Sequence, residues 1–384
     1  MTYTGARRCS DADSHLMEGP GWLESYADPG IRDRLAGFAG EVASAVAAGL
    51  ERRVPVGEDP DPHELLRSKG WAAFGALEVE ERSVVLDALG LERQVVFPTF
   101  APSQFMFSKD DDVLYGGIDA LNRGVADVCS GDQRLVAVGT IMLRDPERAV
   151  AALDRALADG CGAVWVMTAA EGGRSPAHVV HDPFWARLAE ARVPLVCHVG
   201  GGSGSLKPAW HENGRPIPKD HLGGGENLRS KDFPSIHHAA ETFLSCMVLD
   251  GVFEQFPDLR CGVIELGASW VPGLLRNLDA AARQFGRFEP MLGDLSLQPS
   301  DYIRRQVRFT PFPFDDVGWL IDAEGEELFM FSTDYPHPEG GRDPLAKFEA
   351  SLDDRGIGEA ARDRFYAGNF DDLFGRVPVA AGAS

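Results

Sequence analysis

Two aspartates and a histidine alternate in the polar stretch CSDADSHLMEGP, residues 9–20, where a first core strand is expected. Side chains alternate between the two faces of an extended segment, so Asp13 and His15 point the same way, with Asp11 in line behind them. Carboxylates and an imidazole that aim at one point are suitable ligands for a divalent metal ion. For an isolated motif of this kind, a polar turn in which an aspartate caps a helix is the alternative.

Three later residues with ligand chemistry stand where apolar runs end: His198, Glu265 and Asp334. Each also has a purely structural explanation. His198 could be a histidine satisfied in the core, Asp334 could cap a turn, and Glu265 could pair with Arg308 or cap a helix. The elements that carry these residues decide between the two interpretations.

Apolar runs that alternate with helical patterns would have to position these side chains. Most runs are continuous and rich in Val, Ile and Phe, which is typical of parallel strands covered on both faces. After the opening segment, the strand candidates are RQVVFPTF (93–100), RLVAVGTIML (134–143), GAVWVMTA (162–169), VPLVCHVG (193–200), LRCGVIELG (259–267), VRFTPFP (307–313) and ELFMFSTDYPH (327–337). In the clearest helical pattern, Asp145 caps the helix, Pro146 occupies its first turn and Gly160 ends it.

Eight strand and helix alternations predict an α/β fold, a (β/α)8 TIM-like barrel. A doubly wound open sheet is the competitor, but no glycine-rich phosphate loop follows the first strand. We expect one barrel domain over residues 1–384, with long insertions after strands one and five, at about 19–90 and 200–235. Residues 51–70 of the first insertion are typical of a polar loop leading into a helix. The second insertion is dense in Gly and Pro, and we expect it to lie over the active-site mouth.

The predicted barrel brings the candidate ligands together, because such barrels carry their chemistry at the C-terminal ends of the strands. Asp13 and His15 end strand one, His198 strand five, Glu265 strand six and Asp334 strand eight. Independent structural explanations would all have to coincide at the same end of one barrel. The joint pattern therefore predicts a metal site formed by these five residues.

Composition limits the partners. The formal net charge is −22, and the sequence has no stripe of Lys and Arg that could bind phosphates, so we expect no nucleic-acid partner. No apolar run approaches membrane-spanning length, and no basic segment followed by a hydrophobic one opens the chain, so we expect a cytoplasmic protein without a membrane anchor. Six cysteines without C-x-x-C spacing are expected to be reduced core thiols, namely Cys9, Cys129, Cys161, Cys197, Cys246 and Cys261.

Several segments together resemble the amidohydrolase superfamily, in the branch related to aminocarboxymuconate-semialdehyde decarboxylase. They are DADSH, HDPFWARLAEARVPLVCHVGGG, LDGVFEQFPDLRCGVIELGASWVPGLLRNLD, FSTDYPHPEGG and GNFDDLFG. The resemblance implies a TIM-like barrel that holds one divalent metal ion, sometimes two, with ligands from strands one, five and eight. By position these ligands are Asp13, His15, His198 and Asp334. A homodimer is a common assembly of such barrels.

Two positions depart from the family pattern. Asp13 replaces the first histidine of the first-strand H-x-H motif, which makes the site harder, so that Zn, Fe(II) and Mn all remain candidates. In the decarboxylases of this branch, a histidine before the glycine-rich turn of strand six is thought to act as acid or base, and here that position is Glu265. A carboxylate there can act as general base toward a metal-bound water or bridge two ions.

We therefore predict a metal-dependent hydrolase that uses activated water on an amide, ester or thioester, with Glu265 and Asp334 as catalytic residues. The segment PTFAPSQFMF after strand two favours a largely apolar or aromatic small-molecule substrate. One alternative is a metal-dependent non-oxidative decarboxylase of an aromatic or unsaturated carboxylic acid, and another is a non-catalytic binding barrel. Residues expected next to the ligands or the substrate are Asp11, His237, His238, His337 and Arg308.

Overall fold

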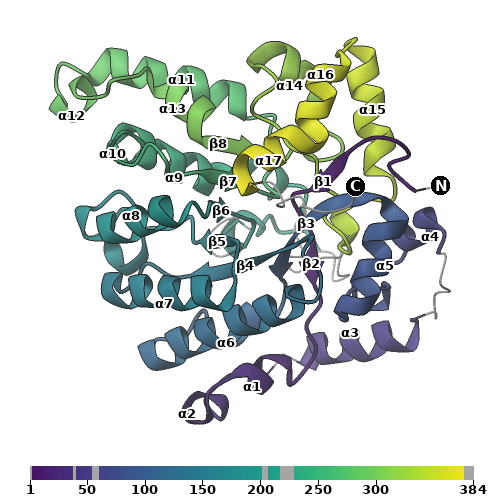
Figure 1. Cartoon of the computed structure of the whole chain (residues 1–384). Coiled ribbons are helices and arrows are strands. Elements are labelled where there is room, and N and C mark those ends of the chain that lie inside the picture. Colours follow the sequence, from purple (N-terminus) through teal and green to yellow (C-terminus); the bar gives the residue numbers. More distant parts are fainter. Residues whose placement is uncertain (1, 38–39, 54–59, 201–205, 217–228, 376–384) are drawn as a thin grey trace, which may run out of the picture.

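A curled sheet of parallel strands organises the chain in the computed structural model, which describes residues 2–37, 40–53, 60–200, 206–216 and 229–375 (Figure 1). The strands are β1 (Cys9–Asp11), β2 (His15–Leu16), β3 (Leu91–Pro98), β4 (Leu135–Ile141), β5 (Ala163–Val166), β6 (Leu195–Cys197), β7 (Cys261–Val263) and β8 (Val307–Phe309). They lie in the order β1-β3-β4-β5-β6-β7-β8, and β2 also pairs with β3. Every one of these pairings is parallel.

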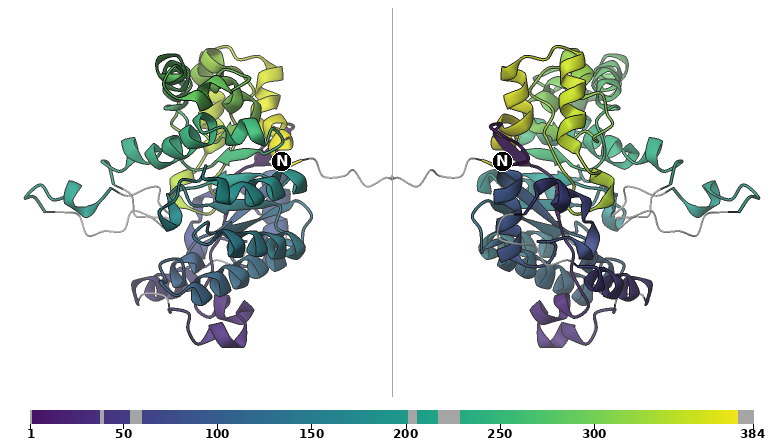
Figure 2. Two further views of the ribbon diagram at one scale, coloured as in Figure 1. Left: turned by 90° about the vertical axis from the view of Figure 1, so that its left-hand side faces the viewer. Right: turned by 90° about the vertical axis from the view of Figure 1, so that its right-hand side faces the viewer.

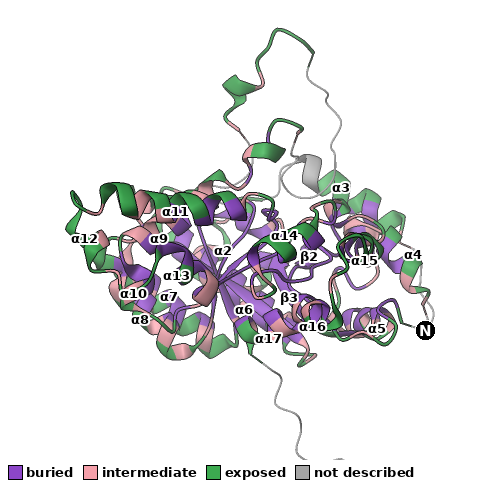
Figure 3. Ribbon diagram, turned by 90° about the horizontal axis from the view of Figure 1, so that it is seen from above, coloured by how far each residue is buried: buried purple, intermediate pink, exposed green. Residues whose placement is uncertain are grey.

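The strands are covered on both faces, as their continuous apolar sequences predict. All residues of β4, β5, β6, β7 and β8 are buried. Seen from above, the buried strands lie inside a ring of helices whose outer faces are exposed (Figure 3). The predicted α/β class is therefore confirmed, and the core lies within the sheet and between the sheet and its helices.

The last predicted strand, 327–337, takes a different form. Within the described chain it pairs only through two isolated parallel bridges, Phe309 with Phe329 and Ser14 with Tyr335. Phe309 N still donates to Leu328 O at 2.8 Å, and Ala12 N donates to Phe331 O at 3.1 Å. The segment thus joins β8 to the start of the chain, and the sheet curls round toward β1. The backbone of this segment turns into a left-handed conformation at Asp334.

Helices follow the strands and cover the outside of the sheet. They are α1 (Trp22–Tyr26), α2 (Pro29–Arg32), α3 (Gly40–Glu51), α4 (Pro62–Arg67), α5 (Val79–Leu89), α6 (Asp111–Cys129), α7 (Pro146–Asp159), α8 (Asp182–Ala191), α9 (His238–Leu249), α10 (Val252–Gln255), α11 (Val271–Phe285), α12 (Pro290–Gly293), α13 (Pro299–Gln306), α14 (Val317–Glu324), α15 (Pro344–Asp354), α16 (Glu359–Asp363) and α17 (Asn369–Phe374). In the described part of the chain, no helix combines the length and the apolar content that a bilayer crossing needs.

Helix α7 has the ends that its sequence predicts. The side chain of Asp145 accepts hydrogen bonds from Glu147 N and Arg148 N, and Pro146 occupies the first turn. Gly160 ends the helix with φ 105°, a value that glycine adopts without steric cost.

The first insertion is mostly helical, and the sequence predicted only one of its helices, the one that follows the polar loop within 51–70. It contains helices α1 to α5, and Leu65, Leu66 and Trp71 from it are buried in the core. The predicted helix within 51–70 is α4, whereas residues 54–59 lie outside the described part. The insertion folds because these apolar side chains give its short helices a face to bury.

The second insertion is described only in part, because residues 201–205 and 217–228 lie outside the described chain. Its described pieces contain short 3₁₀ turns at Pro208–Trp210 and Phe233–Ser235. Residues 206–216 extend away from the sheet (Figure 2). The expected position of this insertion over the mouth stays a prediction.

All six cysteines are free thiols, as predicted. Five of them are buried and Cys246 is half-buried. Burial raises the pKa of Cys9 and Cys129 to about 12, which keeps both thiols protonated and inert at neutral pH.

Candidate metal centre

The polar first segment places Asp13 and His15 side by side at the centre of the sheet. His15 begins β2 and lies opposite Phe97 of β3, while its N–H donates to Tyr335 O at 2.7 Å. Ser14, between the two ligand candidates, donates from Oγ to Val95 O at 2.6 Å. These contacts hold the backbone, so that the buried side chains of Asp13 and His15 both face inward.

Glu265 and Asp334 reach the same point from unusual backbone conformations. Their φ angles are 55° and 52°, and among described non-glycine residues only Arg192 shares a positive φ. Glu265 N donates to Thr310 Oγ1 at 3.0 Å, and Asp334 N donates to Asp13 O at 2.9 Å. Residues in this region cost about 1–3 kcal/mol and cluster at functional sites, where surrounding contacts hold them.

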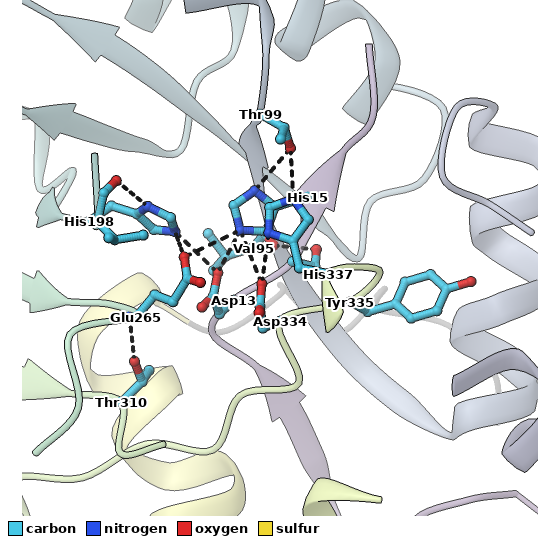
Figure 4. A network of polar contacts seen from close by, with 12 residues as sticks. Asp13, His15, Val95, Thr99, His198, Glu265, Thr310, Asp334, Tyr335 and His337 are labelled. Atoms are coloured by element: carbon cyan, nitrogen blue, oxygen red, sulfur yellow. Dashed lines mark hydrogen bonds and ion pairs between the residues drawn. The ribbon is translucent and has the colours of Figure 1, made fainter. Parts of the chain in front are cut away.

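Five side chains converge from the ends of four segments of the sheet (Figure 4). His15 Nε2 lies 3.4 Å from Asp13 Oδ1 and 3.3 Å from Asp334 Oδ1. His198 Nε2, just after β6, lies 3.5 Å from Asp13 Oδ1 and 3.2 Å from Glu265 Oε2. The structure therefore brings all five predicted ligand candidates together.

The spacing of these donor atoms fits a divalent metal ion. Ligands about 2.1 Å from one ion lie about 3.0 Å apart in an octahedron and about 3.4 Å apart in a tetrahedron. The four contacts above, at 3.2–3.5 Å, are close to the tetrahedral spacing, and the atoms of Asp13, His15, His198 and Glu265 all lie within 4.8 Å of one another. Asp13 Oδ1, His15 Nε2 and both carboxylate oxygens of Asp334 are buried without a hydrogen-bond partner among the described residues. Buried polar atoms of this kind need a ligand.

A second, overlapping group of donors consists of His15, Glu265, Asp334 and His337. The rings of His15 and His337 stack, with centroids 3.8 Å apart, and His337 Nδ1 lies 3.2 Å from Asp334 Oδ1. Because the two groups share His15 and Glu265, they describe one site rather than two separated ones. His337 therefore lies beside two of the ligand candidates, and its role next to a metal or a substrate stays a prediction.

The charges of this site attract positive charge. Burial alone would lower the pKa of His15, but the adjacent carboxylates of Asp13 and Asp334 outweigh it and raise the pKa to about 9. Burial would raise the pKa of Asp334, whereas His337 and His15 hold it well below its usual range. A divalent cation can take the place of the proton on His15 Nε2.

Thr99, which follows β3, links the two stacked histidines. Its Oγ1 lies 3.3 Å from His15 Nδ1, 3.2 Å from His337 Nε2 and 3.8 Å from Met17 Sδ. If His15 Nε2 binds an ion, the proton of that ring is on Nδ1 and is donated to Thr99. The hydroxyl proton then points to His337 Nε2, which leaves the other proton of His337 on Nδ1, facing Asp334 Oδ1.

Glu18 fixes the loop that carries Thr99. Its fully buried carboxylate accepts from Thr99 N at 3.0 and 3.1 Å and from Phe100 N at 2.9 Å. Sequence reasoning missed both Glu18 and Thr99. The signal for Thr99 was its place at the C-terminal end of a predicted strand, where barrel chemistry is expected.

Asp11 supports the site from behind instead of binding in it. It accepts from Thr333 N at 2.8 Å, Thr333 Oγ1 at 2.6 Å, Gln94 Nε2 at 2.8 Å and Asp13 N at 3.2 Å. Asp11 thereby ties the segments that carry Asp13 and Asp334 to β3. This position agrees with the prediction that Asp11 lies next to the ligands.

Three further residues predicted near the ligands or the substrate are not members of the two donor groups, and their role stays a prediction. Arg308 donates to Asp372 Oδ2 of α17 at 2.6 Å and to backbone carbonyls, so it neither pairs with Glu265 nor joins the donor groups. His237 stacks on Trp270, with ring centroids 5.0 Å apart, and its neighbour His238 begins α9. Sequence periodicity places these residues near strand ends but does not give the direction of their side chains.

Comparison with known proteins gives a family match over nearly the whole chain. The sequence model of the amidohydrolase family matches residues 11–376. Among curated proteins, no sequence matches significantly.

Several solved structures share the fold. An amidohydrolase from Mycobacterium avium subsp. paratuberculosis has a TM-score of 0.75 and 24% identity, covering 96% of this chain and 100% of its own. A 5-carboxyvanillate decarboxylase from Novosphingobium aromaticivorans, solved with manganese and 3-methoxy-4-hydroxy-5-nitrobenzoic acid, has a TM-score of 0.64 and 18% identity, covering 97% and 99%. A 2,6-dihydroxybenzoate decarboxylase from Rhizobium has a TM-score of 0.61 and 16% identity, covering 96% and 98%.

These comparisons correct the predicted hydrolase activity, which is wrong. The solved structures with this fold are mostly decarboxylases of aromatic acids, and they match the alternative rather than the main prediction. The error came from assigning proton delivery to the strand-six position. A glutamate at position 265 does not exclude protonation of a carbon atom, because other ionisable side chains, His337 and Asp334, lie beside the same point.

Removing one ligand candidate should release the metal. We expect His198→Ala and Asp334→Ala each to lower metal retention at least tenfold, because each removes a donor from a different strand. The exposed His178 gives a control, His178→Ala, that should keep the metal. Mass-spectrometric metal analysis after gel filtration should give about one ion per wild-type chain. Unchanged metal content in either ligand variant would contradict the site.

The bridging role of Thr99 has a separate test. Thr99→Val keeps the side-chain shape but removes the hydroxyl, so we expect kcat to fall roughly 10- to 100-fold with the metal content unchanged. Thr99→Ser restores the hydroxyl and should recover most of the activity. The pH profile of kcat should change in Thr99→Val, because His337 loses its partner at Nε2. Equal activities of the valine and serine variants would rule out the role.

Proposed function

This chain belongs to the amidohydrolase family, and we propose that it catalyses the metal-dependent, non-oxidative decarboxylation of an aromatic carboxylic acid. The observation that carries the proposal is the buried convergence of Asp13, His15, His198, Glu265 and Asp334 on one point. The decarboxylases with the same fold support the reaction class. We also propose that the curled sheet closes as an eight-stranded barrel in a single domain over 1–384, with the two insertions at about 19–90 and 200–235.

Manganese(II) is the ion that we propose. Carboxylate oxygens suit Mn(II), and imidazole is compatible with it, whereas the site offers no thiolate. Two solved decarboxylases with this fold contain bound manganese. When bound, the ion supplies the positive charge that orients the carboxylate of the substrate.

The reaction replaces a carboxylate with a proton. The bond between the ring carbon and the carboxyl carbon breaks, carbon dioxide leaves, and the electron pair stays on the ring carbon, where one proton adds. Asp334 and His337 are the groups that we propose to hold this proton, because His337 Nδ1 lies 3.2 Å from Asp334 Oδ1. Thr99 keeps the proton of His337 on the nitrogen that faces Asp334.

Aromatic and apolar side chains beside the site support an aromatic substrate. The ring of Phe97 packs on His198, with centroids 4.2 Å apart. Phe312 and Pro313 line a small cavity of about 10 Å³, together with Glu265 and Asp334. These aromatic and apolar side chains favour a substrate with a flat, apolar ring that carries a few polar groups.

Release of carbon dioxide from aromatic acids tests the proposal. We expect the Mn(II)-loaded protein to decarboxylate at least one member of a panel of hydroxylated benzoates and to place deuterium on the ring carbon in D₂O. Asp334→Asn should lower kcat roughly 100-fold or more, because a neutral amide cannot replace the carboxylate that faces His337 Nδ1 and holds the proton there. Asp322, which is exposed on α14, gives the control Asp322→Asn. Turnover of esters or amides without any carbon dioxide release would overturn the proposal.

A further inference from the structure

Three phenylalanine rings cluster at the edge of the metal centre, and we call this cluster the aromatic platform: Phe233, Phe312 and Phe314. Phe312 and Phe314 follow β8, and their rings stack with centroids 5.2 Å apart and 21° between their planes. Phe233 comes from the second insertion, and its ring centroid lies 5.6 Å from that of Phe312 and 5.2 Å from that of Phe314. Two segments that are distant in the sequence therefore meet in one apolar surface.

Phe312 joins the aromatic platform to the metal centre. It lines the small cavity that Glu265 also lines. Its ring packs against Gly267, where an added Cβ atom would lie 2.7 Å from Phe312 Cδ2. Asp315 fixes this connection, because its Oδ2 accepts from Phe312 N at 2.9 Å and from Ala268 N at 3.0 Å. The inner end of the platform is thus held beside the segment that carries a ligand candidate.

The outer part of the aromatic platform faces solvent. Phe233 is 45% exposed and Phe314 is 59% exposed, although both side chains are large and apolar. Keeping neighbouring aromatic surfaces in water costs free energy, and an apolar group that covers them removes this cost. Exposed apolar surface that continues from a site is typical of a surface that binds a ligand.

A buried carboxylate holds Phe233 in place. Asp232, the residue before it, is only 1% exposed. Asp232 accepts from Leu206 N at 2.7 Å and from Arg229 N at 2.8 Å, and its Oδ1 lies 3.0 Å from His211 Nε2. These contacts join the two described pieces of the second insertion at one point. Phe233 is therefore positioned by hydrogen bonds of its neighbour, even though its own ring is largely exposed.

The chemistry of the aromatic platform limits what can cover it. Its three side chains offer no hydrogen-bond donor or acceptor, so a charged or strongly polar group would lose water there without compensation. An aryl group instead packs on such rings in stacked or edge-on contacts. A substrate whose carboxylate meets the donor atoms of the metal centre extends the rest of its body away from them. Its far end is therefore the part that can reach the platform.

We propose that the aromatic platform binds an aryl substituent on the substrate, and that the protein thereby selects aromatic acids with a second, apolar ring. The inference rests on the proposed decarboxylase function and adds three residues that determine specificity. Phe233 and Phe314 contact the second ring, and Asp232 acts through Phe233 as a positioning residue.

Equilibrium binding tests the proposal without turnover. Isothermal titration calorimetry of the Mn(II)-loaded protein would compare benzoate with biphenyl-3-carboxylate and biphenyl-4-carboxylate, which add a phenyl ring in two directions. We expect the wild-type protein to bind at least one biphenylcarboxylate tenfold or more tightly than benzoate. Phe233→Ala and Phe314→Ala should each reduce this preference at least threefold, because each removes one ring of the platform. Both variants should leave the affinity for benzoate within about twofold.

Two further variants keep the test decisive. Phe288→Ala removes an exposed phenylalanine between α11 and α12 and should keep the whole preference. Asp232→Asn should reduce the preference although all three rings are present, because one acceptor oxygen becomes a donor. Equal affinities of the wild-type protein for the three acids, or a preference that both Phe233→Ala and Phe314→Ala leave unchanged, would overturn the inference. A preference that depends on the platform without any carbon dioxide release would sustain the inference and count only against the decarboxylase proposal.

Discussion

Mutual repulsion among buried carboxylates is the constraint on which this site depends. Asp13, Glu265 and Asp334 are all at most 5% exposed, and they point at one place from different segments of the sheet. Burying even one ion costs on the order of several kcal/mol without compensation. His15 and His198 relieve part of the repulsion, and a divalent cation at the centre would relieve most of the rest. This explains why the first strand is polar. Its inward-facing side chains are suited to bind an ion, whereas the inward-facing side chains of the other strands are mostly apolar and pack against one another.

The parallel sheet supplies this convergence, and a layer of hydrogen bonds refines it. Asp11 ties the backbone of Asp13 and of Thr333 to β3, so two ligand segments share one anchor. Glu18 performs the same task for Thr99, whose hydroxyl orders the two stacked histidines. The buried polar side chains of Asp11 and Glu18 are hydrogen-bonded to the residues that they position. Because these groups are satisfied, the polar segment at the start of the chain is compatible with a stable core.

Sequence reasoning worked where a residue's role follows from its place on a strand. The continuous apolar runs predicted the buried parallel strands, and the strand ends predicted all five residues that meet at the centre. It failed where the direction of a side chain decides: Arg308 turns toward α17, and His237 stacks on Trp270. Apart from α4, the helices within 19–90 were not predicted, because their burial is set by tertiary contacts.

The central claim is that one divalent ion is held by side chains from several ends of one sheet. Anomalous diffraction from crystals of the Mn(II)-loaded protein, collected at the manganese absorption edge, tests it most directly. The account predicts one strong peak per chain, about 2.0–2.3 Å from donor atoms of His15, His198 and Asp334 and of Asp13 or Glu265. A peak at another place, or no peak in protein that retains manganese in solution, would contradict it.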